Sequence, residues 1–314
     1  MKFFILIIFA SIKIYALMSD TDISPWGINK KSYMNIEILD QKVISFDNIE
    51  GKKFSEISDL TYDKKRNIFY MVSDEGYLFT LKVRFKNDKI VSLNPLSGAI
   101  IKRTKKRNFT RIQRDSEGVT LDSKNRLIIS FESRPKIGIF NKNGILQRLY
   151  KLPHQLRYRK NLRHRNKSME GVAYHPKYGI ISANEYPIKT QDKKVQSLYS
   201  LRGKEWRFQM SNAKNSAITA IEVMDDDNIL VLERAYSGLF EPFVITLRKV
   251  YIKNCKREKM CKTKVMAQFN SSNGWRVDNF EGLARISKNR YIIISDDNDN
   301  FYQDTIMIYF KIKE

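Results

Sequence analysis

Residues 281–298, EGLARISKNRYIIISDDN, begin with a glutamate and a glycine and continue as two apolar runs separated by a polar turn. The second run ends in acidic residues. The same pattern recurs in EGVTLDSKNRLIISFES (117–133), EGVAYHPKYGIISANEY (170–186), SDLTYDKKRNIFYMVSDEG (58–76) and the degenerate TAIEVMDDDNILVLER (219–234). Recurring strand–turn–strand units at such spacing are typical of β-propellers, in which each unit belongs to one blade. The sequence therefore predicts an all-β fold with a single propeller.

The spacing of the units predicts the number of blades. Their first residues lie 59, 53, 49 and 62 residues apart, which fits four strands and their loops per blade. The last unit ends one strand short, whereas residues 34–46, MNIEILDQKVISF, precede the first unit without a blade of their own. We expect five blades, with residues 34–46 completing the last blade and closing the ring. A degenerate sixth blade within residues 84–110 is the alternative.

The composition excludes several classes of enzyme. The chain has 314 residues, 42% of them hydrophobic, and only three His. It contains no HExxH, GxSxG, GxxxxGK[ST] or GxGxxG motif, which removes the common zinc protease, serine hydrolase, P-loop and dinucleotide-binding signatures. Any chemistry must therefore use mainly carboxylates, hydroxyls and basic side chains.

The charge of the chain is strongly positive, with 57 Lys and Arg against 34 Asp and Glu. Such a field attracts polyanions, so we expect a small anionic or phosphorylated substrate, or an anionic envelope surface, as a partner. Basic runs occur at residues 102–107 and 157–165. The second run includes Tyr158 and His164, but a nucleic-acid partner is the less favoured interpretation, because such runs are also common in solvated loops.

The N-terminus indicates export, which in turn bears on the state of the two cysteines. Residues 1–16, MKFFILIIFASIKIYA, have the basic start, apolar stretch and small final residue of a signal peptide cleaved near Ala16. We expect a secreted or periplasmic protein whose propeller domain covers residues 32–314 and whose mature chain has no transmembrane span. In an oxidising compartment, Cys255 and Cys261 are expected to form a disulfide across a hairpin, with a metal or redox role as the alternative.

The repeats bring acidic residues to equivalent positions around the axis. Because the innermost strand of each blade lines the channel, the leading residues should form a ring: Ser58, Glu117, Glu170, Thr219 and Glu281. The end of the second strand adds a second set: Asp74, Glu132, Glu185, Glu233, Asp296 and Asp297. The spacing alone does not show which end of the channel each set faces.

Clustered carboxylates repel one another unless a cation compensates them. One interpretation is a calcium site at Glu117, Glu170 and Glu281, with an amide oxygen of Asn184 or Asn298. Another is internal ion pairing with Arg234 or Arg134. A third is structural, with each glutamate accepting backbone hydrogen bonds from the neighbouring blade.

These units resemble a known family, the phytase-like domain described as having esterase-like activity. The resemblance rests on DNFEGLARISKNRYIIISDDNDNFYQDTIMIYFKI, RDSEGVTLD…LIISFES, SMEGVAYH…IISANEY, NILVLERAYSGLFEPFVITLRKV and ISDLTYD…FYMVSDEG, from about residue 52 to 312. It implies a β-propeller, an exported setting and hydrolysis of ester or phosphoester bonds. The positions that match its motifs are Glu117, Glu170, Glu233, Arg234, Glu281, Asp296, Asp297 and Asn298. The chain departs from the family at Asp59, where a glycine is usual, and in its basic loops.

Together these observations predict a hydrolase of phosphate or carboxylic esters that uses channel carboxylates with calcium. The expected catalytic residues are Glu281, Glu117, Glu170, Arg234 and Asp296. The expected substrate-binding residues are Arg134, Glu233, Asp297 and Asn298. The alternative is a non-catalytic propeller that binds anionic envelope polymers or a partner protein, and a metal-dependent lactonase is a third choice.

Overall fold

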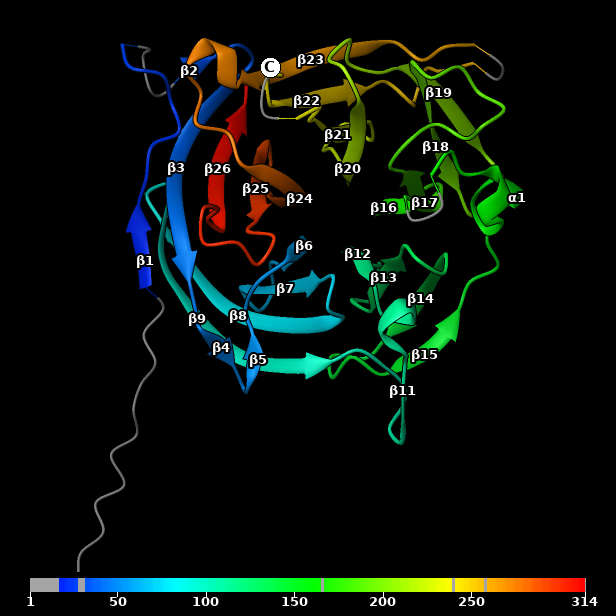
Figure 1. Ribbon diagram of the computed structural model, residues 1–314, viewed down its shortest axis with the longest axis horizontal. Coiled ribbons are helices and arrows are strands. Elements are labelled where there is room, and N and C mark those ends of the chain that lie inside the picture. The colour runs from blue at the N-terminus through cyan, green and yellow to red at the C-terminus, as the bar shows by residue number, and fades with distance from the viewer. Residues whose placement is uncertain (1–16, 28–31, 165–166, 239–240, 257–258, 314) are drawn as a thin grey trace, which may run out of the picture.

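Each repeated unit folds into an antiparallel pair of strands, as its two apolar runs and polar turn predict. In the computed structural model, which describes residues 17–27, 32–164, 167–238, 241–256 and 259–313, these pairs form the inner halves of five sheets. The sheets are arranged around a central axis like the blades of a propeller (Figure 1). The predicted five-blade β-propeller is confirmed.

The first four blades each contain four strands in chain order. The first consists of β6 (Ile57–Asp63), β7 (Ile68–Ser73), β8 (Tyr77–Lys86) and β9 (Lys89–Ile100). The second consists of β12 (Ser116–Leu121), β13 (Leu127–Phe131), β14 (Lys136–Phe140) and β15 (Leu146–Leu149). The third consists of β16 (Met169–His175), β17 (Gly179–Asn184), β18 (Val195–Ser200) and β19 (Glu205–Gln209). The fourth consists of β20 (Ser216–Val223), β21 (Ile229–Ala235), β22 (Val244–Val250) and β23 (Thr263–Asn270).

The fifth blade combines both ends of the described chain. It contains β24 (Asn279–Ser287), β25 (Arg290–Asp296), β26 (Ile306–Ile312) and the N-terminal β3 (Ile36–Ser45). In Figure 1 the blue β3 lies beside the red β26, and Ile308 pairs with Gln41. The predicted closure by residues 34–46 is confirmed. β1 (Leu17–Asp20) and β2 (Ser32–Tyr33) also pair with β3, so the sheet extends N-terminal of residue 32.

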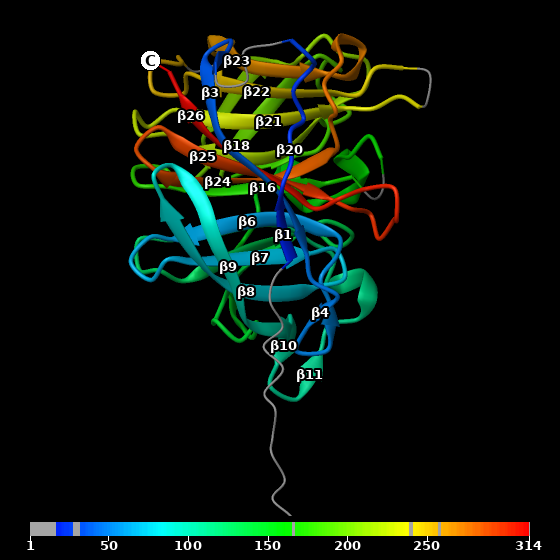
Figure 2. The same ribbon diagram turned by 90° about the vertical axis from the view of Figure 1, so that its left-hand side faces the viewer.

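The segment considered for a sixth blade belongs to the first blade. β8 and β9 form one long hairpin, and a short hairpin of β10 (Lys102–Thr104) and β11 (Arg107–Asn108) follows it and projects from the body (Figure 2). The remaining short elements lie in loops: β4 (Asn48–Ile49), β5 (Lys52–Lys53), η1 (Arg111–Gln113), α1 (His154–Arg157), η2 (Arg159–Asn161) and η3 (Ser271–Asn273).

The hydrophobic core is divided among the interfaces between neighbouring blades. Five clusters of buried side chains each join two blades; one of them packs Leu232 of β21 against Leu283 of β24. Another cluster joins the last blade to the first, because it contains both Ile294 of β25 and Leu60 of β6. Burial of apolar surface therefore closes the ring and holds the five inner strands around the channel.

The inner strands approach one another closely where the repeat carries glycine. A Cβ atom on Gly118 would lie 2.5 Å from the carbonyl oxygen of Glu170 in the next blade. Asp59 replaces this glycine in the first blade, and its buried carboxylate accepts hydrogen bonds from the N–H groups of Val119 (2.8 Å) and Leu283 (3.0 Å). Asp59, which departs from the family pattern, thus connects the first blade to both of its neighbours.

The predicted disulfide between Cys255 and Cys261 is present, in the loop between β22 and β23. Within the described residues, no helix has the length and apolar character needed to cross a membrane. The predicted signal peptide, residues 1–16, lies outside the described residues.

Candidate active site in the channel

Each inner strand has a β-bulge at the first residue of its repeat. In the fifth blade, Phe280 pairs with Ser295 and Gly282 with Ile294, which leaves Glu281 as the extra residue. The same irregularity occurs at Ser58, Glu117 and Thr219, and in the third blade it includes Glu170. A bulge interrupts the alternation of a strand and re-aims a side chain. The leading residues are thus the unpaired positions of the five inner strands.

The register also identifies the second set of channel residues. Each inner strand begins opposite the end of its antiparallel neighbour, so both sets lie at the same end of the channel. At this point each second strand ends in, or is followed by, a charged residue that is acidic in four blades and basic in one: Asp74, Glu132, Glu185, Arg234 and Asp296. One arginine therefore replaces an acid in the fourth blade.

This register differs from the sequence prediction at Glu233, which was expected to be the acidic member in the fourth blade. Glu233 pairs with Ile218, and its buried carboxylate accepts bonds from Arg248 Nε (3.0 Å) and Nη2 (3.1 Å). Asn184 occupies the corresponding position in the third blade, opposite Met169. Both residues are therefore one position away from the second set, and Arg234 takes the place assigned to Glu233.

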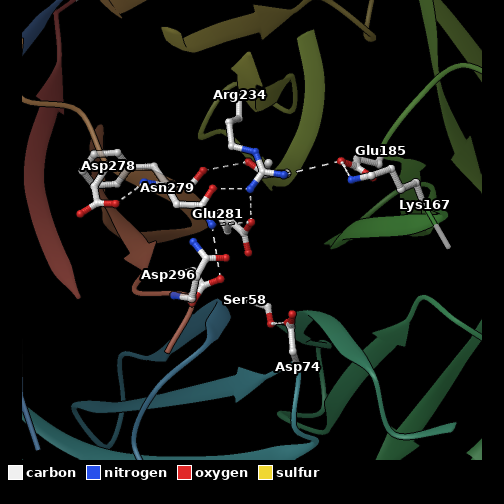
Figure 3. A network of polar contacts seen from close by, with 12 residues as sticks. Ser58, Asp74, Lys167, Glu185, Arg234, Asp278, Asn279, Glu281 and Asp296 are labelled. Atoms are coloured by element: carbon white, nitrogen blue, oxygen red, sulfur yellow. Dashed lines mark hydrogen bonds and ion pairs between the residues drawn. The ribbon is translucent and has the colours of Figure 1, made fainter. Parts of the chain in front are cut away.

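Arg234 lies at the centre of a polar network (Figure 3). Its Nη1 contacts Glu281 Oε1 and Asn279 Oδ1, and its Nη2 lies 3.6 Å from Glu185 Oε1. Asn279 Nδ2 donates to Glu281 Oε1 (3.0 Å) and to Asp296 Oδ2 (3.3 Å). Asn279 thus connects the ion pair of Arg234 and Glu281 to the carboxyl group of Asp296.

A second cation lies on the opposite side of Arg234. Lys167 Nζ donates to both oxygens of the buried Glu185 carboxylate, at 2.8 and 3.0 Å. Figure 3 shows Glu185 and Lys167 on one side of the guanidinium and Glu281 with Asp296 on the other. Below this network in Figure 3, the Ser58 hydroxyl donates to the carboxyl group of Asp74 at 2.5 Å. The network around Arg234 therefore joins side chains of the third, fourth and fifth blades.

The carboxylates form two further groups that have the donor chemistry of a hard cation. Asp74, Asp115 and Glu117 each offer one oxygen, and these oxygens lie within 4.8 Å of one another. Glu132, Glu170 and Glu185 form the other such group. Ca²⁺ prefers oxygen ligands of this kind. Lys167 already compensates the second group, whereas the neighbours that dominate the pKa of Glu117 are all acidic, so the first group fits a calcium ion better.

Burial and mutual repulsion raise the pKa values of these acids. Burial, reinforced by the charge of Glu281, raises the pKa of Asp74 to about 8 and that of Asp296 to about 9. Burial and the charge of Asp115 raise the pKa of Glu132 to about 8.

Glu117 and Glu170 are affected in the same way. Burial and neighbouring carboxylates raise the pKa of both groups well above their usual range. Burial alone would lower the pKa of Arg234, but Glu281 and Glu185 outweigh it and hold the guanidinium charged. Without a bound cation, several acids of the channel are therefore protonated at neutral pH.

A cavity of about 630 Å³ opens beside Arg234. Aromatic and amide side chains form much of its wall: Tyr186, Tyr236, Phe243, Tyr302, Asn215, Asn279, Asn298, Asn300 and Gln303. Among the predicted site residues, Arg234 and Asn298 line this cavity. A ligand in this space would lie against Arg234 and Asn279, the two lining residues that contact Glu281.

The predicted site residues do not form one cluster. Glu117, Glu170 and Glu281 lie in three different groups, with Asp115, with Glu185 and with Arg234 respectively. Asp297 accepts bonds from Ser55 Oγ (2.6 Å) and the N–H of Glu56 (2.9 Å), which ties the last blade to the chain before β6. Arg134 is exposed in the turn between β13 and β14. Their functional roles stay predictions.

Three residues of the site were not predicted from the sequence. Asp115 and Asn279 each lie two residues before a repeat glutamate, and Lys167 lies three residues before Glu170. A polar residue shortly before the bulge is thus a common feature of these units. In the sequence this feature appears as DSEG, KSMEG and DNFEG, each of which begins before the repeat glutamate.

The fold and the channel define a β-propeller with clustered carboxylates, and the comparison with known families agrees. The model of the phytase-like family, described as "Esterase-like activity of phytase", matches residues 52–299. The chain belongs to this family. No curated protein matches the sequence.

Similar solved structures are distant in sequence. One is the PQQ-bound aldose sugar dehydrogenase of Streptomyces coelicolor, with 8% identity, a TM-score of 0.40, and coverage of 87% of this chain and 98% of that chain. Another is a catalytically inactive virginiamycin B lyase of Staphylococcus aureus with quinupristin, with 8% identity, a TM-score of 0.41, and coverage of 95% of this chain and 99% of that chain.

Proposed function

We propose that this protein is an exported hydrolase of phosphate or carboxylic esters and that its reaction centre lies at Arg234, Glu281 and Asp296. The observation that carries the proposal is the position of Asn279, which donates to both Glu281 and Asp296. One of these acids contacts an arginine, and the other has a pKa of about 9 because of burial and the charge of Glu281. Two neighbouring acids in different environments are suited to the roles of base and acid.

The proton transfers follow from these environments. Glu281, ion-paired with Arg234, is the carboxylate that takes a proton from water as the water oxygen bonds to the carbonyl carbon or the phosphorus. Asp296, protonated at neutral pH, gives its proton to the leaving oxygen as the ester bond breaks. Within the described residues, the hydrogen bonds to Glu281 go to Oε1, which leaves Oε2 for the water.

Arg234 is suited to stabilise the negative charge that develops on the reacting group. It lines the cavity, so a bound ester would lie within its reach. Asn298 also lines this cavity and is proposed to contact the substrate, whereas Glu233 is assigned a structural role because Arg248 occupies its carboxylate.

Calcium is proposed to bind at Asp74, Asp115 and Glu117, with Glu170 and its neighbours as the weaker alternative. A bound calcium ion would supply electrostatic stabilisation of an anionic substrate group. Export is proposed because the disulfide between Cys255 and Cys261 suits an oxidising compartment. Cell fractionation with mass spectrometry of the N-terminus tests this part; protein found only in the cytoplasm with an intact Met1 would contradict it.

The test of the activity compares p-nitrophenyl phosphate with p-nitrophenyl butyrate, with and without added Ca²⁺. We expect turnover of at least one ester and a loss of about 100-fold or more in Glu281→Gln, the usual range for a general base. Glu37→Gln, a matched change on β3 in the outer part of the last blade, should retain the activity. Absence of turnover in the wild type, or full turnover in Glu281→Gln, would contradict the proposal.

A further inference from the structure

The positive charge of the chain is concentrated in one segment. Residues 102–167 contain 20 Lys and Arg and four Asp and Glu, a net charge of +16 out of +23 for all 314 residues. All four acids form contacts within the blades. Glu117 and Glu132 belong to the channel groups, Asp115 accepts a hydrogen bond from Ser133, and Asp122 accepts one from Arg126. The outer surface of this segment is therefore almost uniformly basic.

The basic residues follow the outer side of the ring from the second blade to the loop that leads into the third. We call residues 102–108 and 146–163 the basic rim; together they carry eleven Lys and Arg and no Asp or Glu. The N–H of Lys102 donates to the carbonyl of Gly144 (2.8 Å), which fixes the β10–β11 hairpin against the start of β15. Figure 1 shows this hairpin, β15 and α1 following one another along the edge of the ring.

The projecting hairpin has no internal compensation for its charge. Arg103, Lys105, Lys106 and Arg107 are all exposed, and none of them forms an ion pair with any residue that the structure describes. Four like charges on one short hairpin repel one another, which disfavours the folded hairpin unless an external anion compensates them. An anionic partner is the compensation that fits this arrangement.

Two features of the rim fit a lipid surface better than a nucleic acid. Arg157 and Lys160 lie over the ring of Tyr158, at 5.8 and 5.6 Å from its centre, and the His154 ring lies at 5.1 Å. The aromatic ring that would stack on a base is thus already in contact with neighbouring side chains. Leu149 on β15 and Ile112 just after the hairpin are exposed by 50% and 62%, as expected of apolar side chains that enter a bilayer interface.

We propose that the basic rim is a docking surface for a bilayer that contains anionic phospholipids. Basic side chains near such a surface each strengthen the attraction, and salt weakens it. The attraction does not require the chemistry in the channel, because the channel acids lie on or beside the two inner strands of each blade, whereas the rim comprises the hairpin, the outermost strand β15 and the loop after it. The protein would in this way be held at a membrane surface by one edge of its ring.

The test is co-sedimentation of the mature chain with vesicles of phosphatidylcholine alone or of phosphatidylcholine with phosphatidylglycerol. We expect binding only to the anionic vesicles, weak at about 1 M salt and strong at about 0.1 M. The variant Arg103→Gln, Lys105→Gln, Lys106→Gln, Arg107→Gln should bind at least about tenfold more weakly.

The matched control removes four charges at the far end of the first blade: Lys64→Gln, Lys65→Gln, Arg84→Gln, Lys86→Gln. Two of these residues lie near the β8–β9 turn, where Lys86 pairs with Lys89, whereas the hairpin follows Ile100, which pairs with Tyr77. The control should retain most of the binding. Equal losses in both variants, equal binding to neutral vesicles, or tighter binding to single-stranded DNA of equal charge would overturn the proposal. Circular dichroism melts confirm that both variants are folded.

Discussion

Arg234 contacts Glu281 at a position where the other four blades carry an acid. It also lies 3.6 Å from Glu185, so one guanidinium compensates carboxylates from two blades. Its side chain is 19% exposed, which makes the interaction less screened than a surface ion pair. The fourth blade therefore supplies a positive charge to the carboxylates of its two neighbouring blades.

Replacing Arg234 by glutamine should destabilise the protein strongly at pH 8. Removing one partner of a buried ion pair leaves the other charges uncompensated, which costs roughly 3–5 kcal/mol of unfolding free energy. The cost should shrink at pH 5, because burial raises the pKa of the neighbouring Glu185 and lower pH favours its neutral form. Urea unfolding at both pH values measures the difference; an equal loss at pH 5 and pH 8 would be evidence against this balance.

In the presence of a chelator, the free energy of unfolding should fall as the pH rises from 5 to 8. Asp74 and Asp296 have pKa values of about 8 and about 9 in the folded protein, against 3.8 for an unperturbed aspartate. The folded chain therefore binds more protons than the unfolded chain in this window, and deprotonation favours unfolding. One pKa unit corresponds to about 1.4 kcal/mol, and we expect a net loss of at least that size.

The variants Asp74→Asn and Asp296→Asn should each make this dependence on pH shallower. Acids with lowered pKa values, such as Asp63 and Asp122, affect stability only at lower pH and do not mask the effect. Urea midpoints between pH 5 and 8 provide the measurement. Stability that increases over this range in the wild type would refute the assignment.

With calcium bound, the free energy of unfolding should instead rise with pH, since calcium binds ionised carboxylates. At pH 8 and a calcium concentration about 100 times the dissociation constant, we expect about 2.7 kcal/mol of stabilisation. Glu117→Gln, which removes one ligand of the Asp74 and Asp115 group, should abolish most of it. Glu241→Gln, a change at an exposed ion pair with Lys214, serves as the control. Thermal melts with calcium and with chelator would show no difference if the group binds no metal.

The disulfide between Cys255 and Cys261 should stabilise the protein modestly. The bond closes a short loop, with a sequence separation of 6, and the chain-entropy model gives about 2 kcal/mol for a loop of this length. The double variant Cys255→Ser, Cys261→Ser should lose about this amount in urea unfolding, with the same slope. A larger loss would mean that the loop also supports the packing of Cys261 against the third and fourth blades.

The repeats in the sequence were sufficient to predict the blades, because each apolar run forms a buried strand and each polar turn connects two of them. Closure by residues 34–46 followed from counting strands. The site was only partly predictable, since a bulge of one residue decides which side chain faces the channel. The sequence therefore indicated Glu233, whereas the register selects Arg234. Asn279 and Lys167 could not be assigned, because their roles depend on contacts between blades.

The most direct test of the account is a ¹³C NMR titration of the aspartate and glutamate carboxyl groups in calcium-free protein. The variants Asp74→Asn and Asp296→Asn assign the two resonances. We expect both carboxyls to lose their protons only above about pH 7, because burial and the charge of Glu281 raise their pKa values. Titration of both resonances below about pH 5, near the ordinary range for aspartate, would contradict it, and with it the proposed acid at Asp296.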